Sequence, residues 1–216
     1  GICQKRDIQV AAVAVAAGRS HTLTILGNGS VLGWGWDDHG QLGTGAPLYR
    51  TAPVQVALSG ASAVATGGDH SAALKANGTV WTWGANEHYE LGDGTQITRT
   101  SPVNVAGLTG VTAIATGQFH TLALKNDGTV WAWGANSYGE LGDGTQLFHP
   151  TPVQVAGLTG VVAIAAGYSH SLAVKEDGTV WAWGENANGQ LGDGTTTDRA
   201  TPVLGSAFTA SKDAAG

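Results

Sequence analysis

The chain has 216 residues, of which 34 are glycine and 8 are tryptophan, while only 12% are charged. Disordered chains have few aromatic residues and many charges, so this composition excludes disorder and favours short strands joined by tight turns. The net charge of −6 argues against sequence-independent binding to nucleic acid, which needs a basic face. No apolar run approaches the length that spans a membrane. We therefore expect no nucleic-acid partner and no membrane span.

An apolar stretch at residues 10–17 opens the patterned part of the chain, after an N-terminal segment of residues 1–7. Together with Lys5 and Arg6 it resembles a signal peptide, which has a charged start and a small-residue end. The same stretch falls in register with residues 111–117 and 161–167 later in the chain. We favour the second interpretation and expect a first strand at residues 8–16.

A self-alignment of the sequence shows four tandem units of about fifty residues. Each carries Gly-x-x-His, an Asn-Gly or Asp-Gly turn, Trp-x-Trp-Gly, Leu-Gly-Asp-Gly-Thr and Pro-Val in this order, with degenerate copies in the first unit. The histidines of the first motif are His21, His70, His120 and His170. We divide the chain into repeats 8–56, 57–105, 106–155 and 156–205, which form one domain at residues 8–205, followed by a flexible tail at residues 206–216.

Each unit fits four short strands, which in the last unit we expect at residues 161–165, 170–175, 179–184 and in a segment after Pro202. The Asn-Gly and Asp-Gly dipeptides tolerate the positive φ of a tight hairpin. On the third strand Trp181 and Trp183 face one side while Val180 and Ala182 face the other, so both faces of the small sheet need cover. Stacked four-stranded antiparallel sheets provide it. The pattern predicts an all-β fold, a β-propeller with one blade per repeat.

The last repeat reads Gly-x-x-His-Ser-Leu-Ala-Val-Lys-x-Asp-Gly-Thr-Val-Trp-Ala-Trp-Gly-x-Asn-x-x-Gly-Gln-Leu-Gly-Asp-Gly-Thr at residues 167–195. This string resembles the regulator of chromosome condensation repeat family, and the resemblance covers about residues 8–205. It implies a β-propeller, and the propellers of this family usually have more blades than this chain has repeats.

The same resemblance implies guanine-nucleotide exchange on a small GTPase through an inserted β-wedge, and nucleosome binding through basic loops and a basic tail. The four units differ in length by a single residue, which leaves no such insertion, and Lys212 is the only basic residue of the tail. We therefore expect no enzyme. We favour a non-enzymatic scaffold that binds a protein, secreted or at the cell surface rather than cytoplasmic; an exchange-factor-like regulator of a small GTPase is the alternative.

Closure of the propeller is left open by the sequence. The first strand has no preceding Pro-Val strand, and the segment after Pro202 has no following first strand. The two ends could therefore meet in a closed ring of four blades. We favour an open arc of a larger propeller, which leaves apolar end faces near Trp34 and Trp183 in water. Such ends predict self-association of the chain.

The repeated histidines and aspartates suit metal ions only if they converge. A residue present in every copy normally builds every copy, so we expect each histidine to hydrogen-bond its own loop. Asp93, Asp143 and Asp193 each stand alone in their unit and are typical turn residues. No nucleophile motif, phosphate loop or zinc spacing occurs. We expect no catalytic site, no metal site and no cofactor.

Residues that vary between the copies are free for recognition, and they gather in the loops after the first and third strands. Aromatic and histidine side chains on such loops are typical anchors of protein contacts. The candidate binding residues are Arg19, Trp36, His39, Tyr49, Asp69, His88, Tyr89, Phe119, Tyr138, Phe148, His149 and Tyr168. Arginine also recurs at Arg50, Arg99 and Arg199, with His149 in the remaining copy. These residues could form a weakly basic arc for an acidic partner, but we expect each arginine to pair with a nearby repeated aspartate.

Overall fold

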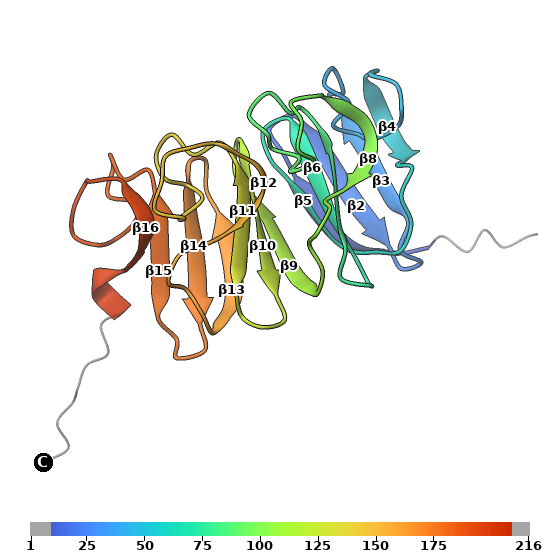
Figure 1. The fold of residues 1–216 in the computed structure, drawn as a ribbon. Helices are drawn as coiled ribbons and strands as arrows, with labels where there is room; N and C mark the ends of the chain where they lie inside the picture. Colours follow the sequence, from blue (N-terminus) through green and yellow to red (C-terminus); the bar gives the residue numbers. More distant parts are fainter. Residues whose placement is uncertain (1–9, 209–216) are drawn as a thin grey trace, which may run out of the picture.

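Four antiparallel sheets of four strands each make up the computed structural model, which describes residues 10–208 (Figure 1). Strands follow one another within each sheet in chain order, so each repeat is one blade: β1–β4, β5–β8, β9–β12 and β13–β16 are blades 1 to 4. The first strands are β1 (Ala12–Ala17), β5 (Ala61–Thr66), β9 (Val111–Thr116) and β13 (Val161–Ala166). The second strands are β2 (His21–Leu26), β6 (His70–Lys75), β10 (His120–Lys125) and β14 (His170–Lys175).

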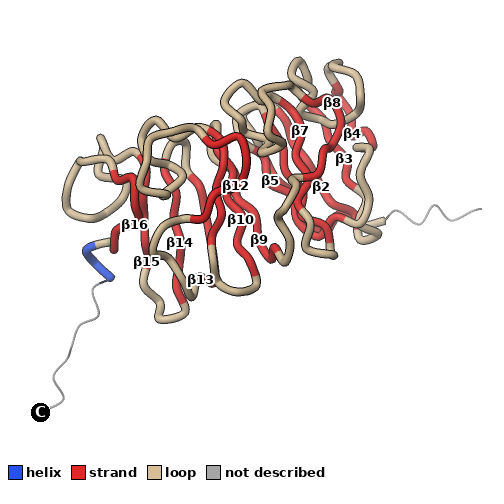
Figure 2. Tube along the Cα trace, viewed as in Figure 1, coloured by secondary structure: helices blue, strands red, loops and turns tan. Residues whose placement is uncertain are grey.

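The third strands are β3 (Val31–Gly35), β7 (Val80–Gly84), β11 (Val130–Gly134) and β15 (Val180–Gly184). The fourth are β4 (Arg50–Gln55), β8 (Arg99–Asn104), β12 (His149–Gln154) and β16 (Arg199–Leu204), and a short 3-10 turn at Ser206–Phe208 follows. Strand and loop segments alternate along the whole trace (Figure 2). The all-β propeller architecture expected from the sequence is confirmed.

The prediction for the fourth strand was wrong, because the observed strand begins before the proline and not after it. In blade 4, β16 starts at Arg199, opposite Gly184, and contains Pro202, whereas we expected it after that proline. The pairing shifts register between Ala182 and Gly184, so the proline lies beside an irregular part of the ladder. Since β16 is the outer strand of its sheet, the missing N–H of the proline costs no inner ladder bond.

The apolar stretch near the N-terminus is a strand. β1 pairs with β2 through residues such as Ala14 with Ile25 and Ala16 with Leu23, in agreement with the repeat register. Of the expected strand at residues 8–16, residues 8 and 9 lie outside the described part of the chain, as do the N-terminal segment 1–7 and residues 209–216 of the tail.

The blades stack side by side along an open arc. β1, β5, β9 and β13 contact one another in this order, and the second strand of each blade contacts the first strand of the next. Blades 1 and 4 lie at opposite ends of the row (Figure 1), and within residues 10–208 their sheets do not pack together. The open arc, and not a closed ring, is the form that the structure adopts.

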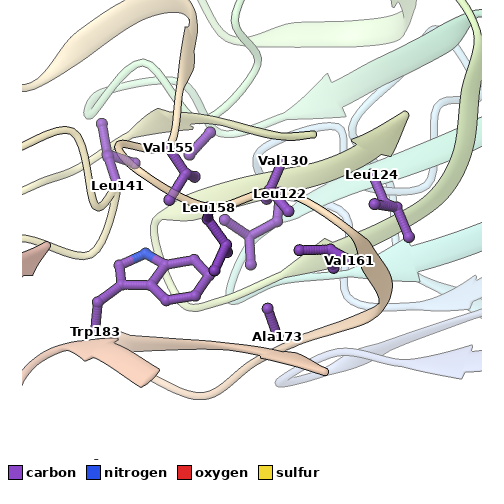
Figure 3. Close-up of a cluster of buried hydrophobic side chains, with 10 residues drawn as sticks. Leu122, Leu124, Val130, Leu141, Val155, Leu158, Val161, Ala173 and Trp183 are labelled. Atoms are coloured by element: carbon purple, nitrogen blue, oxygen red, sulfur yellow. The ribbon is translucent and has the colours of Figure 1, made fainter. Parts of the chain in front are cut away.

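A buried tryptophan from each later blade fills the space between two sheets. Trp183 projects from β15 toward Leu122 and Val130 of blade 3 and toward Leu158 of the link between blades 3 and 4, and it is fully buried (Figure 3). Trp83 and Trp133 occupy the same place between the preceding pairs of blades. A tryptophan side chain removes a large apolar area from water, so these contacts hold the row of sheets together.

Polar groups join the same pairs of blades, and they repeat at three places. His70 Nε2 lies 3.1 Å from Thr121 Oγ1 of blade 3, and Thr121 Oγ1 in turn donates to the Glu90 carbonyl of blade 2 over 3.0 Å. Trp133 Nε1 donates to that same carbonyl over 2.8 Å. Since the hydroxyl gives its proton to the carbonyl, it accepts one from Nε2. We call this set of histidine, hydroxyl, carbonyl and indole the blade junction.

The other two blade junctions have the same geometry, with hydroxyls from serine. Their members are His21, Ser71, the Gln41 carbonyl and Trp83 between blades 1 and 2, and His120, Ser171, the Glu140 carbonyl and Trp183 between blades 3 and 4. We expected each histidine to bond its own loop; that expectation was wrong for these three rings, which bond the next blade. The glycine of each motif leaves room for the ring: a Cβ on Gly67 would lie 2.2 Å from His70 Cε1.

Arginine and aspartate pair within the repeats as expected. Arg99 lies 2.7 Å from Asp93, and Arg199 lies 2.7 Å from Asp193. His149 Nε2 lies 2.8 Å from Asp143 Oδ2, although the N–H is not aligned for a hydrogen bond. Asp93, Asp143 and Asp193 also accept bonds from the backbone N–H groups two residues on, which is turn chemistry.

The first repeat departs from this pattern. Thr44 replaces the aspartate, and Asp37 replaces the buried asparagine of the other repeats. Asp37 is fully buried, and burial raises the pKa of its carboxyl group. Arg50 Nε is buried without a hydrogen-bond partner among the described residues. The first repeat has therefore lost its ion pair between the loop and the outer strand.

Candidate binding face

The variable loops emerge together at one end of the blades. In blade 4, His170 at the start of β14 lies opposite Gly184 at the end of β15, so the loops before and after these residues share one end of the sheet. The same pairing joins His21 with Gly35, His70 with Gly84 and His120 with Gly134. We call the surface formed by these loops the loop face.

A buried asparagine holds each long loop after the third strand in blades 2 to 4. In blade 3, Asn136 Oδ1 accepts from Leu141 N, and Nδ2 donates to Asp143 Oδ1 and the Thr145 and Leu147 carbonyls. Asn86 and Asn186 make the corresponding bonds. These bonds fix the loop backbone, so the side chains on it are held by a rigid frame.

The loop face carries two clusters of candidate residues, the first over blades 1 and 2 and the second over blades 2 to 4. Four residues with aromatic rings form the second cluster. The His88 ring lies 4.6 Å from the Phe119 ring and 6.0 Å from the Phe148 ring, measured between centroids. Phe119 meets Tyr168 edge to face at 6.4 Å. Tyr168 is 65% exposed and Phe148 36%. The loops thus bring together rings that lie far apart in the sequence and leave part of their surface in water.

A groove of about 440 Å³ runs beside these rings and also has an acidic wall. Its lining includes Phe119, Tyr138, Phe148 and Tyr168 together with Glu140 and Glu185. Glu140 is almost fully buried and accepts from Tyr138 N over 2.9 Å. Burial raises the pKa of the Glu140 carboxyl group, and the neighbouring charges of Glu185 and Asp198 act in the same direction. The groove therefore combines aromatic faces with excess negative charge.

Five further loop candidates gather over blades 1 and 2 and form what we call the first cluster: Arg19, Trp36, His39, Tyr49 and Asp69. Trp36 meets Tyr49 edge to face, with ring centroids 5.0 Å apart. A hollow of about 260 Å³ beside Trp36 is lined by Arg19, His39 and Asp69. This hollow is smaller than the groove and carries both signs of charge.

Three candidates belong to neither cluster: Tyr138, which lines the groove, and His149 and Tyr89. His149 lies on the outer strand β12 beside Asp143, at the position of Arg99 and Arg199 in other repeats but without their hydrogen bond. Tyr89 has a φ of 66°, where the other repeats have Gly40, Gly139 and Gly189 with φ of 74°, 86° and 75°. A tyrosine in this left-handed region is strained, since an L side chain crowds the following carbonyl there.

A further hollow of about 510 Å³ lies along the inner edge of the arc. It is lined by the ends of the first strands and the loops after them, including Arg19, Gln118 and Tyr168. Backbone bonds connect neighbouring loops here, from Gly68 N to the Gln118 carbonyl and from Gln118 N to the Tyr168 carbonyl. Much of the lining is glycine backbone, so this hollow offers few side chains for recognition.

Several residues of the loop face were not among the candidates predicted from the sequence. Leu48, Ile97 and Leu147 occupy one loop position in three repeats, and each is more than half exposed. Glu185 stands where the other repeats have Trp36, Ala85 and Ala135. The signals were present: a recurring apolar residue in a polar loop, and a charge that appears in one copy only.

In residues 10–208, no group of three histidine, cysteine or acidic side chains is placed to hold a metal ion. Over the same range, no helix has the length and apolar character that a membrane crossing requires.

Comparisons with known proteins place this geometry in a family. A model of the RCC1-like domain matches residues 2–215. The crystal structure of human WBSCR16 superposes with a TM-score of 0.82 at 30% sequence identity, and the match covers 92% of this chain and 54% of that one. No curated protein matches the sequence.

Two yeast structures show the same fold. Prp20p of Saccharomyces cerevisiae, described with its binding properties to Gsp1p and histones, has a TM-score of 0.83 at 24% identity, with 91% of this chain and 51% of that one covered. Yeast RCC1 (Prp20) bound to Kap60 has a TM-score of 0.81 at 24% identity, with 91% and 49% covered. The chain thus spans about half the length of these solved structures.

Proposed function

Because the chain belongs to the family of RCC1-like domains, we propose that it is a non-enzymatic binding scaffold whose loop face holds a protein partner. The observation that carries this proposal is the groove beside the second cluster. There, aromatic side chains from three blades stand partly exposed, and two of them, His88 and Phe148, lie on loops whose backbone is fixed by buried asparagines. Rigid aromatic residues are the side chains that contribute most to protein interfaces.

The groove also indicates the chemistry of the partner. Phe119, Tyr138 and Tyr168 supply aromatic rings to the lining, and Glu185 adds a partly exposed carboxylate at the same wall. A lysine or arginine side chain gains from both, through cation–π contact and through a charge-assisted hydrogen bond. The net charge of −6 draws a basic partner toward the chain. We therefore infer a partner segment that combines a basic side chain with apolar neighbours.

A displayed library of random peptides, selected on the immobilised chain, tests this function. We expect enrichment of peptides that carry arginine or lysine beside an apolar residue. Glu185→Gln should lower the affinity for the selected peptides by about tenfold, the effect of one lost charge-assisted hydrogen bond. The matched control is Glu176→Gln, the same change at an exposed turn on the opposite end of blade 4, and it should leave affinity unchanged. Peptides without basic residues, or equal effects of the two changes, would refute the proposal.

Exchange-factor activity on a small GTPase is the second candidate function, and it is considered because the chain belongs to the family of RCC1-like domains. Prp20p, at 24% identity, shares the fold alone. The four repeats have nearly equal lengths and carry no inserted wedge. We therefore expect the chain not to accelerate nucleotide release from a small GTPase loaded with a fluorescent nucleotide. Release well above the uncatalysed rate would establish the exchange function instead.

A further inference from the structure

Blade 4 ends the row with half of a blade junction. His170 occupies the place of His21, His70 and His120, yet its ring has no hydrogen-bond partner among the described residues. The Gln190 carbonyl, in the place of the Glu140 carbonyl, likewise receives neither a hydroxyl nor an indole bond in residues 10–208. A Cβ on Gly142 would lie 2.8 Å from Trp183, whereas nothing lies within 4 Å of such an atom on Gly192.

The apolar part of this end face is also open. Leu172, Val174 and Val180 are partly exposed, although their counterparts Leu122, Leu124 and Val130 are buried against the next blade. With Ala163 and Ala165 they line a hollow of about 150 Å³ whose wall is almost wholly apolar. In the junction between blades 3 and 4, Trp183 fills the corresponding space beside Leu122 and Val130 (Figure 3).

Blade 1 begins the row with the complementary half. Trp34 stands in the place of Trp83, Trp133 and Trp183, which are fully buried, but Trp34 itself is partly exposed. Thr22 stands in the place of the junction hydroxyls and is likewise partly exposed. Val15 is 71% exposed, while its counterpart Ile164 packs in the core between blades 3 and 4.

We propose that a second copy of this chain docks head to tail, with blade 1 of one copy against blade 4 of the other. In this contact Trp34 enters the apolar hollow on blade 4, and its Nε1 donates to the Gln190 carbonyl. The Thr22 hydroxyl accepts from His170 Nε2 and donates to the same carbonyl. The contact repeats the junction that the chain makes three times within itself; one copy supplies the blade 1 half and the other copy supplies the blade 4 half. This proposal does not rest on the proposed function of the loop face.

The two halves differ, so the contact is heterologous, and copies can extend into a row or close into a ring. This asymmetry permits a sharp test by sedimentation velocity at low- to high-micromolar concentration. The wild-type chain should form species larger than its 21.8 kDa monomer. Leu172→Arg blocks the blade 4 end, and Trp34→Glu blocks the blade 1 end; each variant alone should sediment as a monomer.

Mixing the two variants gives the decisive result, since one copy retains each half. The mixture should form a species of twice the monomer mass and nothing larger. Gln154→Arg, at an exposed site on the outer strand β12, is the control and should associate like the wild type. A β-type circular dichroism spectrum verifies that each variant is folded. A wild-type monomer at every concentration, with ends open or joined in a ring, would overturn the proposal, as would a mixture that stays monomeric.

Discussion

Tyr89 is the residue whose backbone departs most from what its side chain prefers. The turn that it occupies requires a left-handed backbone, and the other repeats place glycine there. Strain of this kind persists where the surrounding structure enforces it. Its carbonyl accepts from Gly92 N, and its own N–H donates to the Asn86 carbonyl, so the loop frame does enforce it.

Replacement of Tyr89 separates the strain from the ring. Tyr89→Gly and Tyr89→Ala both remove the aromatic side chain, but only glycine adopts the left-handed backbone without crowding. We expect the glycine variant to be more stable than the alanine variant by about 1 kcal/mol. Urea unfolding of the two proteins measures the difference. Equal stabilities would mean that the turn does not strain residue 89.

The junction histidines are held neutral by burial. Burial lowers the pKa of His70 and of His120 to about 3 and that of His21 to about 4. A group with a depressed pKa stays neutral in the folded chain while the unfolded chain takes up a proton below about pH 6.5. Each histidine therefore lowers the free energy of unfolding as the pH falls from about 6.5 toward its folded pKa.

Buried Asp37, Glu90 and Glu140 act in the opposite direction, because burial raises their pKa values. A comparison of variants cancels these carboxyl groups. Between pH 6.5 and 5, His120→Gln should lose about 1.5 kcal/mol less stability than the wild type, because the unfolded variant has no histidine to protonate at this position. Urea unfolding at both pH values gives the two differences. The same loss in both proteins would contradict a neutral buried His120.

At this scale the sequence predicted contacts within one repeat but not contacts between repeats. Repetition correctly marked the histidines as structural, but the partner of each ring lies on the next blade, which no local pattern shows. The aspartate–arginine pairs were predictable because both members recur at fixed spacing. Tyr89 was singled out as an aromatic loop residue, and only the backbone revealed that it stands at a glycine position.

Among the elements, the contact between neighbouring blades determines the architecture. Each of the three junctions places a hydroxyl between a histidine nitrogen and a carbonyl, in a fully buried site. Buried polar groups that lose a partner cost about 1–3 kcal/mol. The junction hydroxyl is therefore a small group with a large effect on stability.

The chain carries its own control for this claim. Thr121→Val keeps the shape of the side chain but leaves His70 Nε2 without a partner, and should cost about 1–3 kcal/mol. Thr22→Val makes the same change at the open end, where no junction exists within one chain, and should cost under about 0.5 kcal/mol. Urea unfolding at a concentration where the chain is monomeric compares them. Equal costs would mean that the junction bonds do not stabilise the stack.

Strand positions followed closely from the repeat pattern. In blade 4 the second strand was expected at residues 170–175 and is found there, and the first and third differ by one residue at one end. The fourth strand was predicted too late in the sequence, because we took the proline to mark the start of the strand. An outer strand tolerates proline inside it, and that exception depends on the place of the strand in the sheet.

For the whole molecule, four blades produce an open arc with two kinds of surface. The loop face carries the variable residues, and the two end faces carry the halves of a blade junction. The sequence predicted the blades because their strand and turn motifs recur in every repeat. It predicted the variable loops because the repeats differ from one another there. It could not predict which rings meet, since each observed contact among His88, Phe119, Phe148 and Tyr168 joins two different repeats.

Hydrogen–deuterium exchange of the chain with and without a selected basic peptide tests the central claim most directly, because it maps where a partner binds. We predict slower exchange in the loops at residues 117–120, 135–149 and 167–169, which surround the groove. The turns at residues 126–129 and 176–179 lie at the opposite end of the same blades and should exchange unchanged. Protection confined to those turns or to the end strands would contradict a loop face that binds the partner.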